Sequence, residues 1–134
     1  ATGIELLIPD FGGNKKLIDS VLATHPNVVG HNMETVRRLT PHVRSVATYD
    51  RSLKVLSVIA DAGIMCKTGM MLGLGETEDE VLQAMDDILA TGCSILTLGQ
   101  YLQPMTLNRH QFSYGPKDLS VSWQPDNIVA TINS

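Results

Sequence analysis

The sequence predicts an α/β domain built from parallel βα units. Apolar runs of the length of buried strands lie at residues 4–8, 28–31, 64–72 and 94–98. Between these runs, apolar residues recur at the spacing of amphipathic helices, and glycine, proline or polar residues separate the segments. Strands that alternate with helices at this period form a parallel sheet joined by right-handed crossovers.

The first unit begins with the strand from Ile4 to Ile8, and the turn-rich stretch 9–13 is its exit loop. Asn14 is a suitable N-cap for the helix that follows, and the apolar repeat of that helix stops at Pro26.

The second unit begins with the strand at 28–31. We expect a short helix or turn over residues 33–39 that Thr40 and Pro41 end. A longer helix is expected over residues 51–62, because its apolar face closes at Gly63, and glycine is typical just past a helix end.

A glycine-dense turn, Gly73-Leu74-Gly75, follows the third strand. Because glycine has no side chain and tolerates positive φ, backbone amides there can approach a bound molecule, and we expect a ligand at this turn. Thr77 and Glu80 form the Thr-x-x-Glu pattern of a capping box, which predicts the start of a helix that ends at Gly92. The fourth strand follows. After Pro104 the pattern is lost, so residues 105–134 are expected to be irregular.

Composition excludes several classes of function. A length of 134 residues and a hydrophobic content of 43% suit one domain with its own core. The net charge of −4 creates no field that attracts nucleic acid. No apolar run approaches the roughly 20 residues needed to cross a bilayer, and no signal peptide is recognised at the start. We therefore expect a cytoplasmic protein with no nucleic-acid or membrane partner. Cys66 and Cys93 are expected to be two buried thiols.

Polar residues gather near the carboxyl ends of the predicted strands, where parallel βα folds bind ligands. They are His31, Asn32 and Glu34 after the second strand, Lys67 and Thr68 within the third, and Gln100 and Tyr101 after the fourth. An amide and a carboxylate two residues apart on an extended segment can hold a ribose diol between them. The alternative is that Asn32 caps the short helix and Glu34 is a solvated acid in its first turn.

Five motifs resemble, in order and spacing, the later motifs of lipoyl synthases. They are ELLIPDF at 5–11, HNMETV at 31–36, YDRSL at 49–53, KTG to GLGE at 67–76, and GQYLQP at 99–104. The likeness covers residues 3–104, and the IPDF and GQYLQP segments distinguish it from biotin synthase. The resemblance implies part of a (β/α)6 partial TIM barrel of the radical S-adenosyl-L-methionine (SAM) superfamily. It divides the chain into residues 1–104, which form this partial barrel, and residues 105–134, which diverge from the family.

In that family, a 4Fe–4S cluster cleaves SAM to a 5′-deoxyadenosyl radical. The radical removes hydrogens from carbons 6 and 8 of an octanoyl chain on a lipoyl-carrier protein or domain, and a second 4Fe–4S cluster donates the sulfurs.

The resemblance also implies roles for single residues. Asn32 and Glu34 match the positions that hold the ribose of SAM, and Ser52 matches a polar position near its methionyl end. The segment from Gly69 through Gly73, Leu74 and Gly75 matches the part on which adenine rests. Lys67 and Thr68 face the interior at the level of the substrate, with Thr68 counted among the cofactor-binding candidates, and Gln100 and Tyr101 close the mouth of the barrel. The plainer alternatives are that Lys67 is solvated or ion-paired and that Tyr101 is a packed aromatic residue.

Several family features are missing from this sequence: the CxxxCxxC motif of the radical cluster, the second set of three cysteines and the RSSY serine motif. Two cysteines are too few to ligate a 4Fe–4S cluster, so we expect no metal site in this chain and no catalysis by it alone. We interpret it as a piece of a longer lipoyl synthase. The alternative is a non-catalytic βα domain that binds a nucleotide or phosphate at the Gly73–Gly75 turn.

Overall fold

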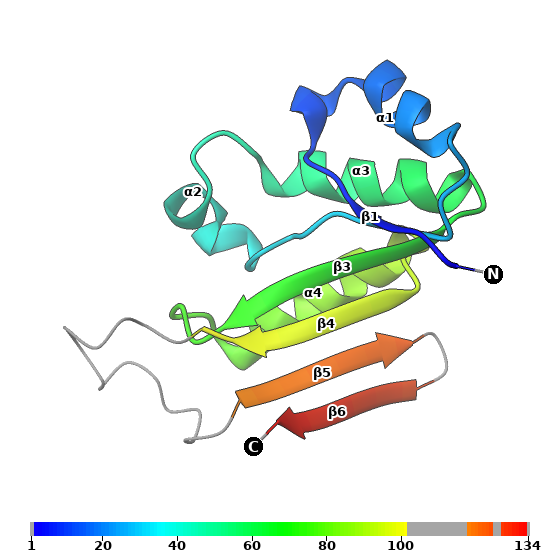
Figure 1. Ribbon diagram of the computed structural model, residues 1–134. Helices are drawn as coiled ribbons and strands as arrows, with labels where there is room; N and C mark the ends of the chain where they lie inside the picture. Colours follow the sequence, from blue (N-terminus) through cyan, green and yellow to red (C-terminus); the bar gives the residue numbers. More distant parts are fainter. Residues whose placement is uncertain (1, 102–117, 125–126, 134) are drawn as a thin grey trace.

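The computed structural model describes residues 2–101 together with the backbone of residues 118–124 and 127–133 (Figure 1). Within these residues, one sheet has the strands β1 (Glu5–Leu7), β2 (Val28–Gly30), β3 (Met65–Leu72), β4 (Ile95–Gln100), β5 (Asp118–Gln124) and β6 (Asn127–Asn133), in that order. Strands β1 to β4 pair in parallel, whereas β5 and β6 are antiparallel to their neighbours. The predicted parallel sheet is therefore confirmed.

Helices connect the parallel strands. They are α1 (Lys15–Leu22), α2 (Thr40–Val43), α3 (Tyr49–Asp61) and α4 (Glu78–Ala90), with the 3-10 turns η1 (Phe11–Gly13) and η2 (Arg37–Leu39). The predicted caps are present: Asn14 Oδ1 accepts from the backbone N of Lys16 at 3.0 Å, and Thr77 and Glu80 form a capping box. Side-chain hydrogen bonds of this kind satisfy amides that have no partner within the helix.

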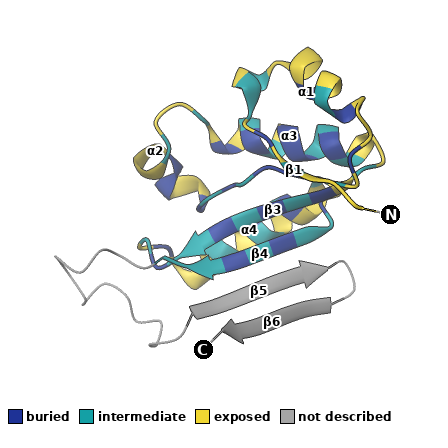
Figure 2. Ribbon diagram, in the orientation of Figure 1, coloured by how far each residue is buried: buried dark blue, intermediate teal, exposed yellow. Residues whose placement is uncertain are grey.

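The hydrophobic core lies between the sheet and helices α1, α3 and α4 (Figure 2). Fully buried side chains from the strands, such as Val29 and Cys66, belong to one cluster with Leu56 and Ile59 of α3 and Ile88 of α4. Cys66 and Cys93 are both free, buried thiols, as predicted. None of the helices in the described ranges is long and apolar enough to span a bilayer.

The connection between β2 and α3 differs from the prediction. Residues after β2 first run extended beside β3, where Glu34 forms an isolated parallel bridge to Met70. Helix α2 then begins at Thr40, which was expected to end a helix. The reason is that proline lacks an N–H group and suits the first turn of a helix as well as it blocks a later one, so Pro41 marks a start here.

The expectation of an irregular segment at 105–134 is wrong for the two ranges that form β5 and β6. The overlooked signal is the alternation of Leu119, Val121 and Trp123 with polar residues, which is the period of a strand. Residues 102–117 lie outside the described residues, and the division of the chain at residue 104 stays a prediction.

Candidate functional site

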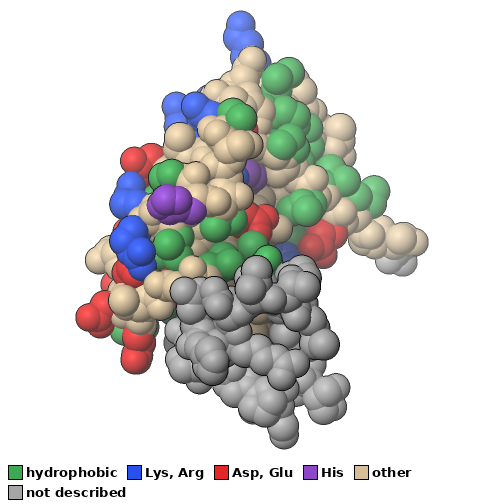
Figure 3. Space-filling model, turned by 90° about the vertical axis from the view of Figure 1, so that its left-hand side faces the viewer, with side chains coloured by type: hydrophobic (Ala, Val, Ile, Leu, Met, Phe, Trp, Pro, Cys, Tyr) green, Lys and Arg blue, Asp and Glu red, His purple; other side chains and the backbone are tan. Residues whose placement is uncertain are grey.

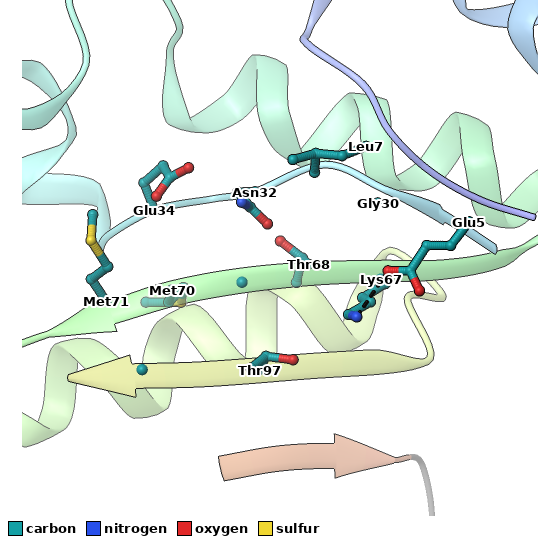
Figure 4. Close-up of a pocket in the computed structure, with 12 residues that line it drawn as sticks. Glu5, Leu7, Gly30, Asn32, Glu34, Lys67, Thr68, Met70, Met71 and Thr97 are labelled. Carbon is teal, nitrogen blue, oxygen red and sulfur yellow. Dashed lines mark hydrogen bonds and ion pairs between the residues drawn. The ribbon is translucent and has the colours of Figure 1, made fainter. Parts of the chain in front are cut away.

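A cavity of about 400 Å³ lies along the sheet beside the residues that follow β2 (Figure 4). It is lined by Glu5, Leu7, Gly30, Asn32, Glu34, Lys67, Thr68, Gly69, Met70, Met71, Thr97 and Gly99. Five predicted site residues, namely Asn32, Glu34, Lys67, Thr68 and Gly69, are thereby brought together. Its volume is in the range of small-molecule sites.

The residues after β2, His31 to Glu34, form an extended segment, here called the strap, that is hydrogen-bonded to β3. The backbone N of Glu34 donates to Gly69 O at 3.0 Å, and its carbonyl accepts from the backbone N of Met71 at 2.7 Å. These bonds hold Glu34 at a φ of 68°, in the left-handed region that non-glycine residues seldom occupy. Such strain is typical of residues whose position is fixed by function.

Asn32 lies directly over Gly69, and a Cβ at residue 69 would come within 3.0 Å of Asn32 Oδ1. Glycine at this point of β3 therefore leaves the space that the amide occupies. The alternative in which Asn32 caps a helix is wrong, because η2 begins after Val36 and has no side-chain cap. Among the described residues, neither the Asn32 amide nor the Glu34 carboxylate makes a hydrogen bond or ion pair with another side chain or backbone group.

Lys67 and Thr68 point in different directions, as neighbours on a strand must. Lys67 Nζ lies 2.9 Å from Glu5 Oε1, so the ion-paired alternative holds for this lysine, and both side chains are partly exposed. Thr68 is buried and its hydroxyl accepts from the backbone N of Met33 at 3.1 Å. Thr68 therefore joins the strap to the middle of β3 and does not lie at the strand's end.

A buried hydrogen-bond chain lies beside the strap. The ring of His31 has Nδ1 2.9 Å from Ile8 O and Nε2 2.8 Å from Ser52 Oγ. Because a carbonyl only accepts, Nδ1 carries the proton and Nε2 accepts from the Ser52 hydroxyl. Arg44 Nη1 donates to the same hydroxyl oxygen at 2.6 Å. Ser52 is fully buried and does not line the cavity, nor the adjoining smaller cavity of about 290 Å³ that His31 and Arg44 line.

Burial lowers the pKa of His31, and the positive charge of Arg44 lowers it further. The Ile8 carbonyl and the carboxylates of Asp10 and Glu34 raise it, but by less in total.

The unfolded chain binds a proton at His31 near pH 6.5, where the folded chain does not. Stability is therefore expected to fall as the pH drops from 7.5 to 5.5. Melting curves across this range test it: His31→Gln should reduce the pH dependence and the exposed His42→Gln should not. Equal pH dependence in both variants would contradict the role of His31.

The side chain of Glu76 occupies two backbone amides of the glycine turn at 73–75. Glu76 is buried, and its two oxygens accept from the backbone N of Gly73 at 2.6 Å and of Leu74 at 2.9 Å. Gly73 and Gly75 have the positive φ values that the sequence predicts. The backbone amides of Gly73 and Leu74 therefore already have an acceptor within the protein, and a ligand at this turn stays a prediction. This arrangement does not favour the alternative of a phosphate site at the turn.

Gln100 and Tyr101 lie where β4 ends. Gln100 is opposite Leu72 in the register of β3 and β4, and the backbone N of Tyr101 donates to Leu72 O at 2.8 Å. Neither residue lines the cavity, although Gly99 does. Figure 3 views this face of the molecule, on which basic and acidic side chains are intermixed along one margin.

Besides glycines, sequence reasoning did not single out five residues of the cavity wall, namely Glu5, Leu7, Met70, Met71 and Thr97. Two of these residues could have been predicted. Met71 is two positions after Gly69 and so shares its face of the strand, and Thr97 is opposite Gly69 in the parallel register. Arg44 had no such signal, since it lies outside every strand and motif.

The family model described as the radical SAM superfamily matches residues 2–88. Lipoyl synthase from Parabacteroides distasonis is 59% identical over 107 residues, which are 80% of this chain and 38% of that protein. Lipoyl synthase from Porphyromonas gingivalis is 62% identical over 106 residues, 78% of this chain and 38% of that protein. The chain thus spans about 38% of the length of the curated relatives it matches.

Among solved structures, coproporphyrinogen III oxidase from Escherichia coli, described as a radical SAM enzyme, aligns with a TM-score of 0.66. The alignment covers 77% of this chain and 24% of that chain at 11% identity, so it supports the fold alone. The resemblance to lipoyl synthases inferred from the motifs is confirmed by the sequence matches.

Proposed function

Because this chain belongs to the radical SAM superfamily, we propose that it forms the SAM-binding part of a lipoyl synthase. The whole enzyme would insert two sulfurs at carbons 6 and 8 of an octanoyl chain carried by a lipoyl-carrier protein or domain. Identity of 59% over 107 residues to a lipoyl synthase supports this proposal. SAM, when bound, supplies the adenosyl group from which the family's radical comes.

The observation that carries the proposal is a pair of polar side chains on the cavity wall that have no partner among the described residues. Asn32 offers an amide and Glu34 a carboxylate, both held by a strap that is hydrogen-bonded to β3. A ribose diol needs one acceptor that takes both hydroxyl protons and one neighbouring donor, and these two groups provide them. In this proposal Gly69 to Gly75 lies against adenine, whose flat and neutral ring needs no amide from the closed turn.

The described residues fit SAM but do not fit an iron–sulfur cluster. A cluster needs three or four thiolates, and Cys66 and Cys93 are both buried in the core. No group of three or more His, Cys, Asp or Glu side chains in the described part of the chain could hold a metal ion. We therefore assign no cluster chemistry to these residues. The substrate side of the proposal comprises Lys67 on the cavity wall and Gln100 and Tyr101 at the end of β4.

Asn32→Ala and Glu34→Ala are each expected to weaken SAM binding about 5- to 150-fold. Each change removes a hydrogen bond to the ribose, and an unpaired polar group costs about 1–3 kcal/mol. Isothermal titration of the 134-residue chain measures the affinity. Asp86→Ala, an exposed acid on α4, is the control and should leave affinity unchanged. Unchanged affinity with a lowered melting temperature in either site variant would reject its ribose role.

A further inference from the structure

The two cysteines of the chain come together at the amino ends of neighbouring strands. Cys66 is the second residue of β3, and Cys93 lies in the turn that joins α4 to β4 (Figure 1). Both belong to the core that the helices cover, with exposed fractions of 0% and 2%, and neither lines the cavity of the proposed site. The two thiols therefore lie on the same side of the sheet, apart from the SAM site.

The pairing of β3 with β4 sets the distance between the two cysteines. Lys67 is opposite Ile95, and the backbone N of Ser94 donates to Cys66 O at 3.0 Å, so Cys66 is level with Ser94. Cys93 is one position further along. Neighbouring strands are about 4.8 Å apart and residues rise about 3.3 Å along a strand, which puts the two cysteine Cα atoms about 6 Å apart. Disulfides join Cα atoms that are roughly 4.4–6.8 Å apart, so this separation suits a disulfide.

The side chain of Cys93 is turned toward β3. Its Sγ lies 3.3 Å from Cys66 O and 3.5 Å from Ile95 O. A hydrogen bond between the two thiols raises the pKa of Cys66 and lowers that of Cys93, in which it outweighs burial. Cys93 is therefore the more readily ionised sulfur, and Cys66 is the neighbouring thiol that can react with it after oxidation.

The position of Cys93 in a turn gives a small oxidant a way to its sulfur. Cys93 directly follows Gly92, which is exposed and has a φ of 87°. The backbone N of Cys93 donates to the hydroxyl of Thr91 at 3.2 Å, within the same turn and outside the sheet. Local opening of this turn exposes Cys93 while the strands stay paired. Cys66 needs no such access, because its partner is already beside it.

We propose that oxidation joins Cys66 and Cys93 in an intramolecular disulfide, so that the pair is a redox modification site of this chain. With hydrogen peroxide, the Cys93 thiolate attacks one oxygen and the O–O bond breaks. The hydroxide that leaves takes up the proton that Cys93 had released, and Cys93 becomes a sulfenic acid. The Cys66 sulfur then attacks the Cys93 sulfur, the S–O bond breaks, and the hydroxyl group leaves as water with the proton of Cys66. Peroxide is reduced to water and the two thiols are oxidised to one disulfide.

The test oxidises the folded 134-residue chain with a slight excess of hydrogen peroxide and then alkylates the remaining thiols in urea. We expect a monomer without alkylated cysteine, a mass lower by about 2 Da before alkylation, and a linked peptide pair that contains Cys66 and Cys93. Dithiothreitol should restore both alkylated cysteines. The oxidised chain should melt about 5–15 °C higher than the reduced chain, because the bond restricts the unfolded segment 66–93.

Cys66→Ser and Cys93→Ser are the matched variants, and serine keeps a donor for the carbonyls of Leu56 and Ile95. In Cys66→Ser, dimedone should trap a sulfenic acid at Cys93, since no second thiol can remove it. In Cys93→Ser, Cys66 should remain a free thiol after the same treatment.

Several results would overturn the proposal. They are two free thiols after oxidation of the folded chain, a sulfinic acid at Cys93 beside a free Cys66, a disulfide that forms only in urea, and crosslinks between chains alone. A lower melting temperature of the oxidised chain would also overturn it, because the bond would then form by distorting the fold. If a serine variant does not fold, these measurements on the wild-type chain still decide. None of them involves SAM, so the result is independent of the proposed function.

Discussion

Replacement of Glu76 by alanine is expected to lower the free energy of unfolding by about 2–4 kcal/mol. The carboxylate accepts from the amides of Gly73 and Leu74 at 2.6 and 2.9 Å, and the first of these bonds is buried. Without Glu76, both donors lose a charged acceptor at a place that water enters poorly. Urea denaturation followed by circular dichroism measures the change.

Two further variants sharpen this test. Glu76→Gln keeps one acceptor oxygen but turns an amide NH2 group toward the other donor, so an intermediate loss is expected. Glu78→Ala removes an exposed acid from the first turn of α4 and should cost less than about 1 kcal/mol. If Glu76→Ala were no more destabilising than Glu78→Ala, the closure of the turn by its own carboxylate would not contribute to stability.

Gly69→Ala is expected to weaken SAM binding as much as Asn32→Ala, about 5- to 150-fold. The added Cβ would lie 3.0 Å from Asn32 Oδ1, so the amide must shift by a few tenths of an ångström and loses its alignment with the ribose in the proposed site. Stability should change little, because a flexible side chain can move without disturbing the sheet. Titration of SAM and a melting curve on the same variant give both quantities.

Gly99→Ala is the matched control, because Gly99 lines the same cavity and a Cβ there would meet none of the described residues within 4 Å. This variant should bind SAM within about twofold of wild type. Equal losses in the two variants would mean that any added methyl group in the sheet disturbs the cavity, and that Asn32 has no special part.

The fold could be predicted from the sequence because the patterns that indicate strands and helices involve residues close together in the chain. Hydrophobic periodicity identified four parallel strands, and the caps at Asn14 and Thr77 fixed where two helices begin. The errors have local causes as well. Pro41 was interpreted as a stop although it suits a first turn equally, and the alternating pattern of β5 was overlooked.

The site could be predicted only in part. Asn32, Glu34 and Gly69 were predicted because spacing at strand ends and motif resemblance both point to them, and the structure brings them to one cavity, while their roles stay predictions. The pairing of Lys67 with Glu5 joins residues 62 positions apart, so no local pattern contains it. The same applies to Arg44, whose relation to the site depends on how α2 folds back toward the strap.

In the proposed site, the backbone of Glu34 gives up stability in favour of binding. Glycine would adopt its φ of 68° without strain, whereas a residue with a side chain gives up about 1–2 kcal/mol in the left-handed region. The hydrogen bonds of the strap hold the residue there, but they use only its backbone and would serve glycine equally well. Only the carboxylate distinguishes Glu34 from a glycine that would be unstrained at this φ. A design that stabilised the chain by relieving backbone strain would therefore replace Glu34 by glycine and lose the carboxylate.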